Sequence, residues 1–210
     1  MNLLRLVFNS SIGKKALVAL AGLSLCGFLV VHLGGNLMLF SGETAFNGYA
    51  ASLDKNPLIP LAEIVLAAIF IGHILLALWT KAENAKARPE NYQVKRWKRD
   101  RWYGSKTAFY TGLLILAFLV IHLKDFRFGS APHGLFRLVM GSFKSATYAG
   151  FYVVAMGALG LHLGHGFRAA FQSLGLRHPR VRPAIDALGA AFAIMVAGGF
   201  AIIPIWAHFK

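Results

Sequence analysis

Five long stretches of mostly apolar residues alternate with shorter polar segments along the chain. The apolar stretches cover residues 16–40, 59–80, 107–123, 146–168 and 186–207. A helix that crosses a bilayer needs roughly 20 apolar residues, and each stretch is close to that length or longer. The segments between them, residues 42–60, 81–106, 124–144 and 169–183, are expected to be interfacial loops. The pattern predicts an all-α fold in which residues 1–210 form one integral membrane domain of five transmembrane helices.

Composition and charge support a membrane protein and give it an orientation. Of the 210 residues 57% are hydrophobic and only 8 are acidic, and the mean hydropathy is +0.57. These values exclude an ordinary soluble domain. Of the 22 Lys and Arg residues, 16 fall on the side that includes the N-terminus. The positive-inside rule therefore predicts an inside N-terminus and an outside C-terminus, and Trp79, Trp102 and Trp206 near helix ends agree with an aromatic belt.

The net charge of +14 constrains the partners. Basic residues are divided among short loops instead of forming a nucleic-acid-binding patch, so no nucleic acid is expected. A basic inner face suits anionic membrane lipid or a soluble protein that docks there, and the pattern leaves both open. The first stretch is too long for a cleavable signal peptide and lacks a small-residue cleavage site. Its cysteine, Cys26, is expected to be a small core residue.

Four of the five apolar stretches contain a histidine: His32, His73, His122 and His162. A histidine in hydrocarbon is costly and is seldom kept there without a partner or a function. Four of them, one per helix, provide two axial imidazoles for each of two haem irons. The alternative is that single histidines bond between helices or line a proton path. Neighbouring glycines at positions 34, 35, 72, 160 and 164 leave room for a flat macrocycle or serve helix packing.

The predicted orientation sorts these histidines into two levels. His32 and His122 lie in the outer halves of outward-running helices, whereas His73 and His162 lie near the inner ends of inward-running helices. With a rise of about 1.5 Å per residue, each pair is level to within about one turn. The hexapeptide FLVVHL at 28–33 is nearly repeated as FLVIHL at 118–123. Two stacked haems are therefore predicted, of the non-covalent b type because no C-x-x-C-H motif is present.

Several short motifs accompany the histidines in order. They are NSSIGKK at 9–15, VHLGGN at 31–36, FNGYA at 46–50, NPL at 56–58, KARP at 86–89 and HLGHGFRAAFQSLGL at 162–176. Together with the four histidines, this arrangement over nearly the whole chain resembles a known family. It is similar to the single-polypeptide, five-helix, di-haem cytochrome b anchor of succinate:quinone oxidoreductases, the succinate dehydrogenase and fumarate reductase group.

The resemblance implies axial haem ligands at His32, His73, His122 and His162. The competitor His165 follows three residues after His162, but the first histidine of the family's H-x-x-[His/Asn]-G pattern is the ligand. The resemblance further implies a flavoprotein subunit that oxidises succinate or reduces fumarate, and an iron–sulfur subunit on the basic inner face. Quinone, commonly menaquinone, would be the lipid-side substrate.

This family works in the respiratory chain and the tricarboxylic acid cycle, which implies a multi-pass protein of the bacterial cytoplasmic membrane. The succinate chemistry would lie on the partner subunit, and this chain would be the quinone-reactive part of the enzyme. One departure concerns proton transfer. Some fumarate-reducing members carry a glutamate two residues before the fourth ligand, where this chain has Gly160, and this favours succinate oxidation.

Two further groups of polar residues are candidate contacts for cofactor and substrate. Haem propionates need donors near the inner ends of the helices, and the candidates there are Ser11, Lys14, Lys106, Arg168 and His165. The alternative for the charged ones is plain positive-inside charge. Quinone chemistry needs a titratable group near a membrane face. Asp54 is the first outer-side candidate, Glu63 the second, and Glu43 a weaker one, with a solvated loop carboxylate as the alternative for Asp54.

Two other functions are compatible with the sequence. The first is a di-haem cytochrome b anchor of another respiratory oxidoreductase, such as a hydrogenase or formate dehydrogenase. Its histidines would be distributed differently among the helices. The second is a haem-free membrane transport or assembly protein, which visible absorption of the purified protein would distinguish.

Overall fold

The computed structural model describes residues 10–87 and 104–210, with side chains from residue 107 in the second range, and this described part consists of helices and their connections. The α-helices are α2 (Ser11–Leu37), α3 (Glu43–Asp54), α4 (Ile59–Lys86), α5 (Gly104–His122), α6 (Leu135–Ser142), α7 (Ala146–Ser173) and α8 (Arg182–Phe209). Two short helical turns, η1 (Met38–Ser41) and η2 (Leu123–Arg127), extend α2 and α5, and η2 is π-helical. Five of the helical segments are long and apolar enough to cross a membrane. The prediction of an all-α chain with five such helices is confirmed.

Local sequence explains where several helices begin. Ser10 caps α2, because its side-chain oxygen accepts a hydrogen bond from the backbone N–H of Gly13 at 2.8 Å. Gly42 and Gly134 have φ angles of +96° and +91° and stand directly before α3 and α6. Only glycine adopts such angles without strain, so these two residues let the chain turn sharply into each short helix.

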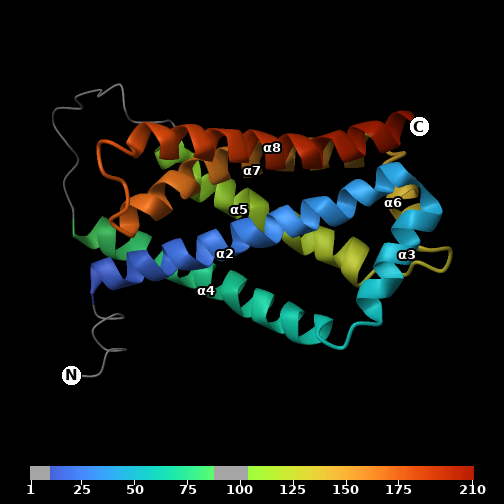
Figure 1. The fold of residues 1–210 in the computed structure, drawn as a ribbon, viewed down its shortest axis with the longest axis horizontal. Helices are drawn as coiled ribbons and strands as arrows, with labels where there is room; N and C mark the ends of the chain where they lie inside the picture. The colour runs from blue at the N-terminus through green and yellow to red at the C-terminus, as the bar shows by residue number, and fades with distance from the viewer. Residues whose placement is uncertain (1–9, 88–103) are drawn as a thin grey trace.

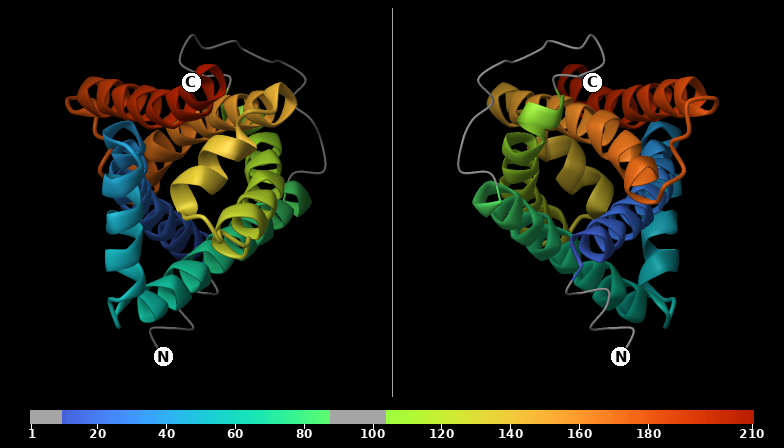
Figure 2. Two further views of the ribbon diagram at one scale, coloured as in Figure 1. Left: turned by 90° about the vertical axis from the view of Figure 1, so that its right-hand side faces the viewer. Right: turned by 90° about the vertical axis from the view of Figure 1, so that its left-hand side faces the viewer.

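The long helices form an elongated bundle (Figure 1). Helix α7 packs against α2, α5 and α8, while α4 packs chiefly against α2. Seen along its length, α2, α4, α5 and α7 surround the long axis, and α8 lies along one side against α7 and α2 (Figure 2). The four helices that carry the histidines of the apolar stretches are therefore the four that surround the axis.

The two ends of the bundle differ. Helices α3 and α6 lie across the end where α2 and α5 finish (Figure 1), and we call this the capped end. The backbone N–H of Phe136 in α6 donates to the side-chain oxygen of Asn47 in α3 at 2.9 Å. On α3, Tyr49 packs so closely on Gly35 that a Cβ there would lie 2.7 Å from the tyrosine oxygen. The FNGYA motif thus fastens α3 to both α6 and α2.

These two helices correct the expectation of loops in residues 42–60 and 124–144. Both segments contain a helix, because each carries apolar residues that pack on the end of the bundle. The resulting core cluster comprises Leu39, Phe46, Val139, Phe143, Ala149, Tyr152, Ile203 and Ala207. The opposite end of the bundle, where α4 and α7 finish and α8 begins, carries Lys14, Lys86, Arg177, Arg180 and Arg182, and we call it the basic end.

The sides of the bundle are apolar and exposed. No described residue of α4 is buried, and Ile64 and Leu75 on that helix are 68% and 60% exposed. Similar exposure recurs on α8 at Ile194, which is 74% exposed. Contiguous apolar surface of this extent suits lipid and would cause aggregation in water. Packing inside the bundle relies on small residues, as in other membrane proteins.

Replacing Gly160 with valine is expected to weaken the packing of α7 on α8. A Cβ at Gly160 would lie 3.0 Å from the Cβ of Ala197 and 3.8 Å from the carbonyl oxygen of Ala193. A branched side chain must therefore push the helices apart, and overpacking of this kind costs about 1–3 kcal/mol. Thermal unfolding of the purified protein in detergent measures the loss as a lower midpoint.

Gly157→Val is the matched control for this experiment. Gly157 lies one turn earlier on α7, is exposed, and a Cβ there meets nothing within 4 Å. This variant should have the same midpoint of thermal unfolding as the wild type. Equal destabilisation by the two substitutions would contradict the assignment of Gly160 to the α7–α8 contact.

Candidate functional site

The first histidine pair consists of His32 on α2 and His122 on α5. Their ring centroids lie 5.9 Å apart and their planes are nearly perpendicular, at 84°. Phe28, one turn before His32, stacks on its ring at 5.1 Å, and Phe118, one turn before His122, stacks on that ring at 5.5 Å. Phe200 of α8 approaches His32 to 5.6 Å. The structure thus brings together the two histidines that were assigned to the outer level.

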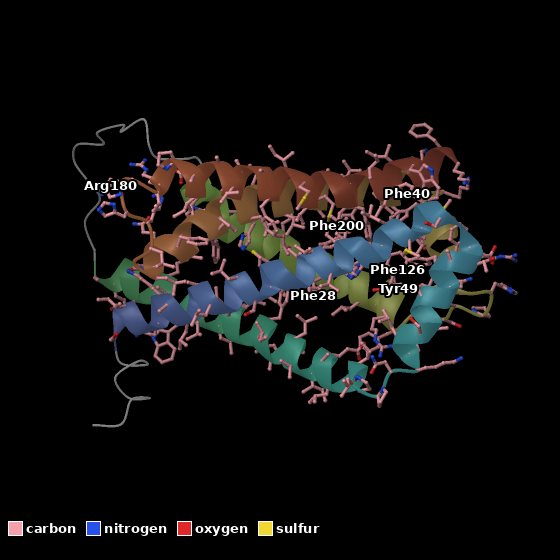
Figure 3. All side chains as sticks on the ribbon, viewed as in Figure 1. Phe28, Phe40, Tyr49, Phe126, Arg180 and Phe200 are labelled. Atoms are coloured by element: carbon pink, nitrogen blue, oxygen red, sulfur yellow. The ribbon has the colours of Figure 1, made fainter. Side chains whose placement is uncertain are left out.

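The first pair lies along the bundle between its middle and the capped end. The neighbouring Phe28 and Phe200 lie near the middle of the bundle, whereas Phe126 lies toward α3 (Figure 3). Phe126 is in ring contact with His122 at 5.6 Å. The pair is therefore enclosed by aromatic rings from α2, α5, η2 and α8.

The second histidine pair consists of His73 on α4 and His162 on α7, nearer the basic end. The Nδ1 atom of His73 lies 3.2 Å from the carbonyl oxygen of Val18, and the Nδ1 atom of His162 lies 3.3 Å from the hydroxyl oxygen of Thr111. The two histidines are close enough to interact electrostatically. The structure thus also brings together the two histidines that were assigned to the inner level.

Each ring of the second pair lies against a glycine of the neighbouring helix. A Cβ at Gly22 of α2 would lie 3.2 Å from Cε1 of His73, and a Cβ at Gly112 of α5 would lie 3.3 Å from Cε1 of His162. Both contacts are tighter than an alanine normally makes. Gly22 and Gly112 therefore make room for the imidazoles, a role that was not predicted from the sequence.

These contacts reveal a repeat within the chain. Residues of α2 and α5 that are 90 positions apart are equivalent: Val18 and Ala108, Gly22 and Gly112, Phe28 and Phe118, and His32 and His122. The repeat extends to the packing, because His73 bonds to the carbonyl of Val18 and His162 lies beside the carbonyl of Ala108. The α2–α4 and α5–α7 pairs are thus two copies of one histidine-bearing arrangement.

Hydrogen bonding fixes which ring nitrogen of the second pair carries the proton. The Val18 carbonyl only accepts, so Nδ1 of His73 is the donor. The Thr111 hydroxyl donates back into α5, to the carbonyl oxygen of Thr107 at 3.0 Å, so it accepts from Nδ1 of His162. Nε2 of both rings then keeps a lone pair, which is the state of metal-ligating histidines whose other nitrogen is held by a hydrogen bond.

The ligand set suits axial ligation by pairs and not a many-ligand metal centre. Within the described residues, no three His, Cys, Asp or Glu side chains gather to hold a metal ion. Haem iron needs only two axial imidazoles from the protein. Two pairs of histidines on facing helices, with neutral rings and apolar surroundings, therefore fit two haems.

The candidate propionate contacts at the basic end have protein partners. Lys14 is buried, forms an ion pair with Glu83 of α4, and lies 4.8 Å from the centre of the Trp79 ring. Arg168 lies 3.8 Å from a carboxylate oxygen of Asp186. These pairs fasten α2 to α4 and α7 to α8.

The remaining candidate propionate contacts are Ser11, Lys106 and His165. Ser11 is exposed at the first position of α2, and the side chain of Lys106 lies outside the described residues. His165 is half-buried, one turn after His162, and interacts electrostatically with His162 and Arg168. The assignment of His165 as a polar contact, with His162 as the axial ligand, stays a prediction.

A cavity of about 590 Å³ opens at the basic end between the end of α7 and the start of α8. Asp186 lies in its wall and forms ion pairs with Arg168, Arg177 and Arg182. The closest pair is Arg177, whose Nη2 donates to both carboxylate oxygens at 2.8 and 2.9 Å, while Arg182 lies at 3.6 Å. Positive charge exceeds negative charge around this cavity, so the basic end keeps a cationic surface.

The candidate quinone-site carboxylates gather at the capped end. Glu63 accepts two hydrogen bonds from Arg127, at 2.7 and 3.0 Å, and Asp54, exposed at the end of α3, interacts electrostatically with the same arginine. Glu43 forms a separate ion pair with Arg137 at 2.8 Å. The first two candidates therefore share a neighbourhood, and the weaker one lies apart from it.

Sequence reasoning missed a polar chain behind His122. The hydroxyl of Tyr152 lies 3.4 Å from Nδ1 of His122, the hydroxyl of Tyr148 lies 3.2 Å from that of Tyr152, and Tyr148 donates to Asp125 at 2.7 Å. Two tyrosines four residues apart on an apolar helix, and an aspartate three residues after a membrane histidine, were the available signals.

Comparison with known protein families, curated proteins and solved structures finds no match to this chain. In residues 10–87 and 104–210, the fold and site define a helical bundle with five helices long and apolar enough to cross a membrane and with two histidine pairs inside it. Functional assignment depends on these pairs and on the motifs around them.

Proposed function

We propose that the chain is the di-haem cytochrome b anchor of a succinate:quinone oxidoreductase. In this role it carries electrons between an iron–sulfur subunit and quinone, with menaquinone the expected type, while a flavoprotein subunit performs the succinate chemistry. The observation that carries the proposal is the pairing of four membrane histidines on four helices at two levels of one bundle. The motifs that resemble this family support the specific assignment.

The histidine pairs are the proposed haem sites. His32 and His122 would hold one haem and His73 and His162 the other, and bound haem would supply a one-electron carrier at each level. The levels are 10 residues apart on α2, from Gly22 to His32, which corresponds to about 15 Å. The residues themselves contribute imidazoles with hydrogen-bonded Nδ1 atoms, close glycine contacts and apolar neighbours.

The orientation in the membrane is part of the proposal. Among the described residues, more Lys and Arg residues lie at the basic end than at the capped end, so the basic end would face the cytoplasm and the capped end the outside. The C-terminus at the end of α8 would then be external. The cationic surface around Arg177, Arg180 and Arg182 offers a docking face to the iron–sulfur subunit, and the same charge suits anionic lipid.

Gly160 supports succinate oxidation as the direction. The glutamate of some fumarate-reducing relatives would have to stand at this position, where α7 touches α8. A Cβ here already lies 3.0 Å from the Cβ of Ala197. A glutamate would need a different separation of α7 and α8, and this supports a function without that proton route.

The purified chain is expected to bind two b-type haems. Four axial imidazoles are present in two pairs, and the chain has no motif for covalent attachment. Pyridine haemochrome analysis measures haem per chain. One haem or none per chain would contradict the two-level arrangement, and absence of haem would favour the transport or assembly alternative.

The axial ligands are expected to behave as pairs. His32→Ala and His122→Ala should each remove the haem of the first pair only, because each deletes one of its two ligands. His73→Ala and His162→Ala should remove the other haem only. Haem content and low-temperature α-band spectra of the variants measure the outcome.

His165→Ala is the matched control for the ligand variants, because it deletes an imidazole one turn from His162. This variant should keep both haems. If it loses the second-pair haem while His162→Ala keeps it, the ligand assignment is wrong.

Quinone turnover is expected to depend on Asp54. Hydrocarbon offers no protons, so quinone needs a proton-transfer group in contact with water, and Asp54 is an exposed carboxylate that interacts electrostatically with Arg127. Asp54→Asn should lower succinate-to-quinone electron transfer on the order of 10²-fold, the lower end of what a positioned proton-transfer group contributes. Assays of the whole complex with quinone and with a soluble dye measure the effect.

Dye reduction and both haem spectra should be unchanged in Asp54→Asn, and Asp54→Glu should restore much of the quinone activity. Normal quinone turnover in both Asp54→Asn and Glu63→Gln would place the quinone site elsewhere, including the basic end beside the iron–sulfur subunit.

A further inference from the structure

A hydrogen-bonded chain joins His122 to a carboxylate at the capped end. It runs from Nδ1 of His122 to the hydroxyl of Tyr152 at 3.4 Å, on to the hydroxyl of Tyr148 at 3.2 Å, and ends on an oxygen of Asp125 at 2.7 Å. Its four residues come from α5, η2 and α7, so the chain spans a tertiary contact and is not a local feature of one helix.

The acceptor at the end of the chain determines the direction of every hydrogen bond. A carboxylate accepts only, so the Tyr148 hydroxyl gives its proton to Asp125. The oxygen of Tyr148 then accepts from Tyr152, and the oxygen of Tyr152 accepts from Nδ1–H of His122. The lone pair of His122 is thereby left on Nε2, the nitrogen that an axial ligand offers to iron.

Burial holds these hydrogen-bonded side chains in one geometry. Tyr152 is 6% exposed, and its ring contacts Phe118, Phe126 and Phe143 edge-on at 4.9, 6.0 and 4.9 Å. Hydrogen bonds in such surroundings are stronger than in water and polarise one another. The charge of Asp125 therefore polarises the hydrogen bonds that link it, through Tyr148 and Tyr152, to His122.

The π-helical turn after His122 belongs to the same arrangement. Asp125 lies within η2, whose wide hydrogen bond runs from the N–H of Phe128 to the carbonyl of Leu123 at 2.9 Å. Single π-helical turns are frequent at functional sites. Here the π-helical turn carries Asp125, the last residue of the hydrogen-bonded chain.

The other three membrane histidines have neutral neighbours. His73 bonds to a backbone carbonyl and His162 to a hydroxyl. The amide of Asn36 lies 3.4 Å from Nδ1 of His32 and also bonds to that residue's carbonyl at 2.8 Å. His122 is thus the histidine of the four whose hydrogen bonding leads to a carboxylate.

We propose that Asp125, Tyr148 and Tyr152 are positioning residues that hold His122 as an electron-rich axial ligand and lower the reduction potential of the first-pair haem. The inference rests on the proposed function. A hydrogen bond from the second ring nitrogen to a carboxylate-backed acceptor raises the basicity of a ligating imidazole. A more basic ligand favours the ferric over the ferrous state, and hydrogen bonding to the ligands is one of the means by which proteins tune haem. The two haems would differ in potential as a result.

Redox titration of the purified, haem-loaded protein tests this inference. Tyr152→Phe removes the acceptor of Nδ1 but keeps the aromatic ring, so both haems should stay bound. The first-pair haem should become easier to reduce, with the ferrous-to-ferric ratio at a fixed potential rising about three- to tenfold, where tenfold corresponds to 59 mV for one electron. The second-pair haem should keep its midpoint.

Three further variants distinguish an effect on the reduction potential from a general loss of structure. Tyr148→Phe breaks the bond to Asp125 without changing any charge and should shift the same haem in the same direction by a smaller amount. Asp125→Glu keeps the carboxylate and should stay close to the wild type. Tyr110→Phe, which removes a hydroxyl from a residue of α5 that is 70% exposed, should change neither haem.

The outcomes distinguish this inference from the proposed function. If wild type and Tyr152→Phe both bind two haems and the potential of the first-pair haem is unchanged, the inference is wrong and the function stands. An equal shift of both haems would also overturn it. If Tyr152→Phe loses haem, the test passes to Tyr148→Phe: an unchanged potential of the first-pair haem in that variant would overturn the inference. A wild-type chain without haem would overturn the proposed function, and the inference with it.

Discussion

The arrangement of this bundle depends on one requirement: an imidazole inside a membrane needs a polar partner. His73 finds its partner in the backbone of α2, and His162 and His122 find theirs in side chains of α5 and α7. Each bond joins two different helices, so satisfying the histidines also decides which helices are neighbours. Hydrophobic association cannot do this in lipid, because every helix is surrounded by hydrocarbon in any arrangement.

The repeat between α2 and α5 follows from this requirement. Gly22 and Gly112 lie at equivalent positions and each accepts the ring of a histidine from the next long helix. Two helix pairs of the same design then meet at the contact of α2 with α7, and α8 covers that contact from outside. Gly199 of α8 lies so close to Leu33 that a Cβ would approach its side chain to 2.9 Å. The fifth helix therefore supports the bundle and contributes no histidine to the pairs.

The long helices and the levels of the histidines were predictable, since apolar length and rise per residue are local properties of the sequence. The short helices α3 and α6 were not predictable, because their apolar residues are buried only by packing on the end of the folded bundle. Lys14 is a candidate propionate contact, and its ion pair with Glu83, 69 positions away, was not predictable from the sequence. The tyrosine chain behind His122 was missed for the same reason: it links three elements that no sequence period connects.

The carboxylates of the capped end are suited to different tasks by their neighbours. Glu43 and Glu63 are each paired with an arginine, and a carboxylate in an ion pair is a poor proton acceptor because protonation breaks the pair. Asp125 accepts from Tyr148, which is linked through Tyr152 to His122. Asp54 remains exposed beside Arg127, in contact with water. In the proposed function, proton exchange with quinone would therefore fall to Asp54, whereas the charge of Asp125 would act inward, on His122.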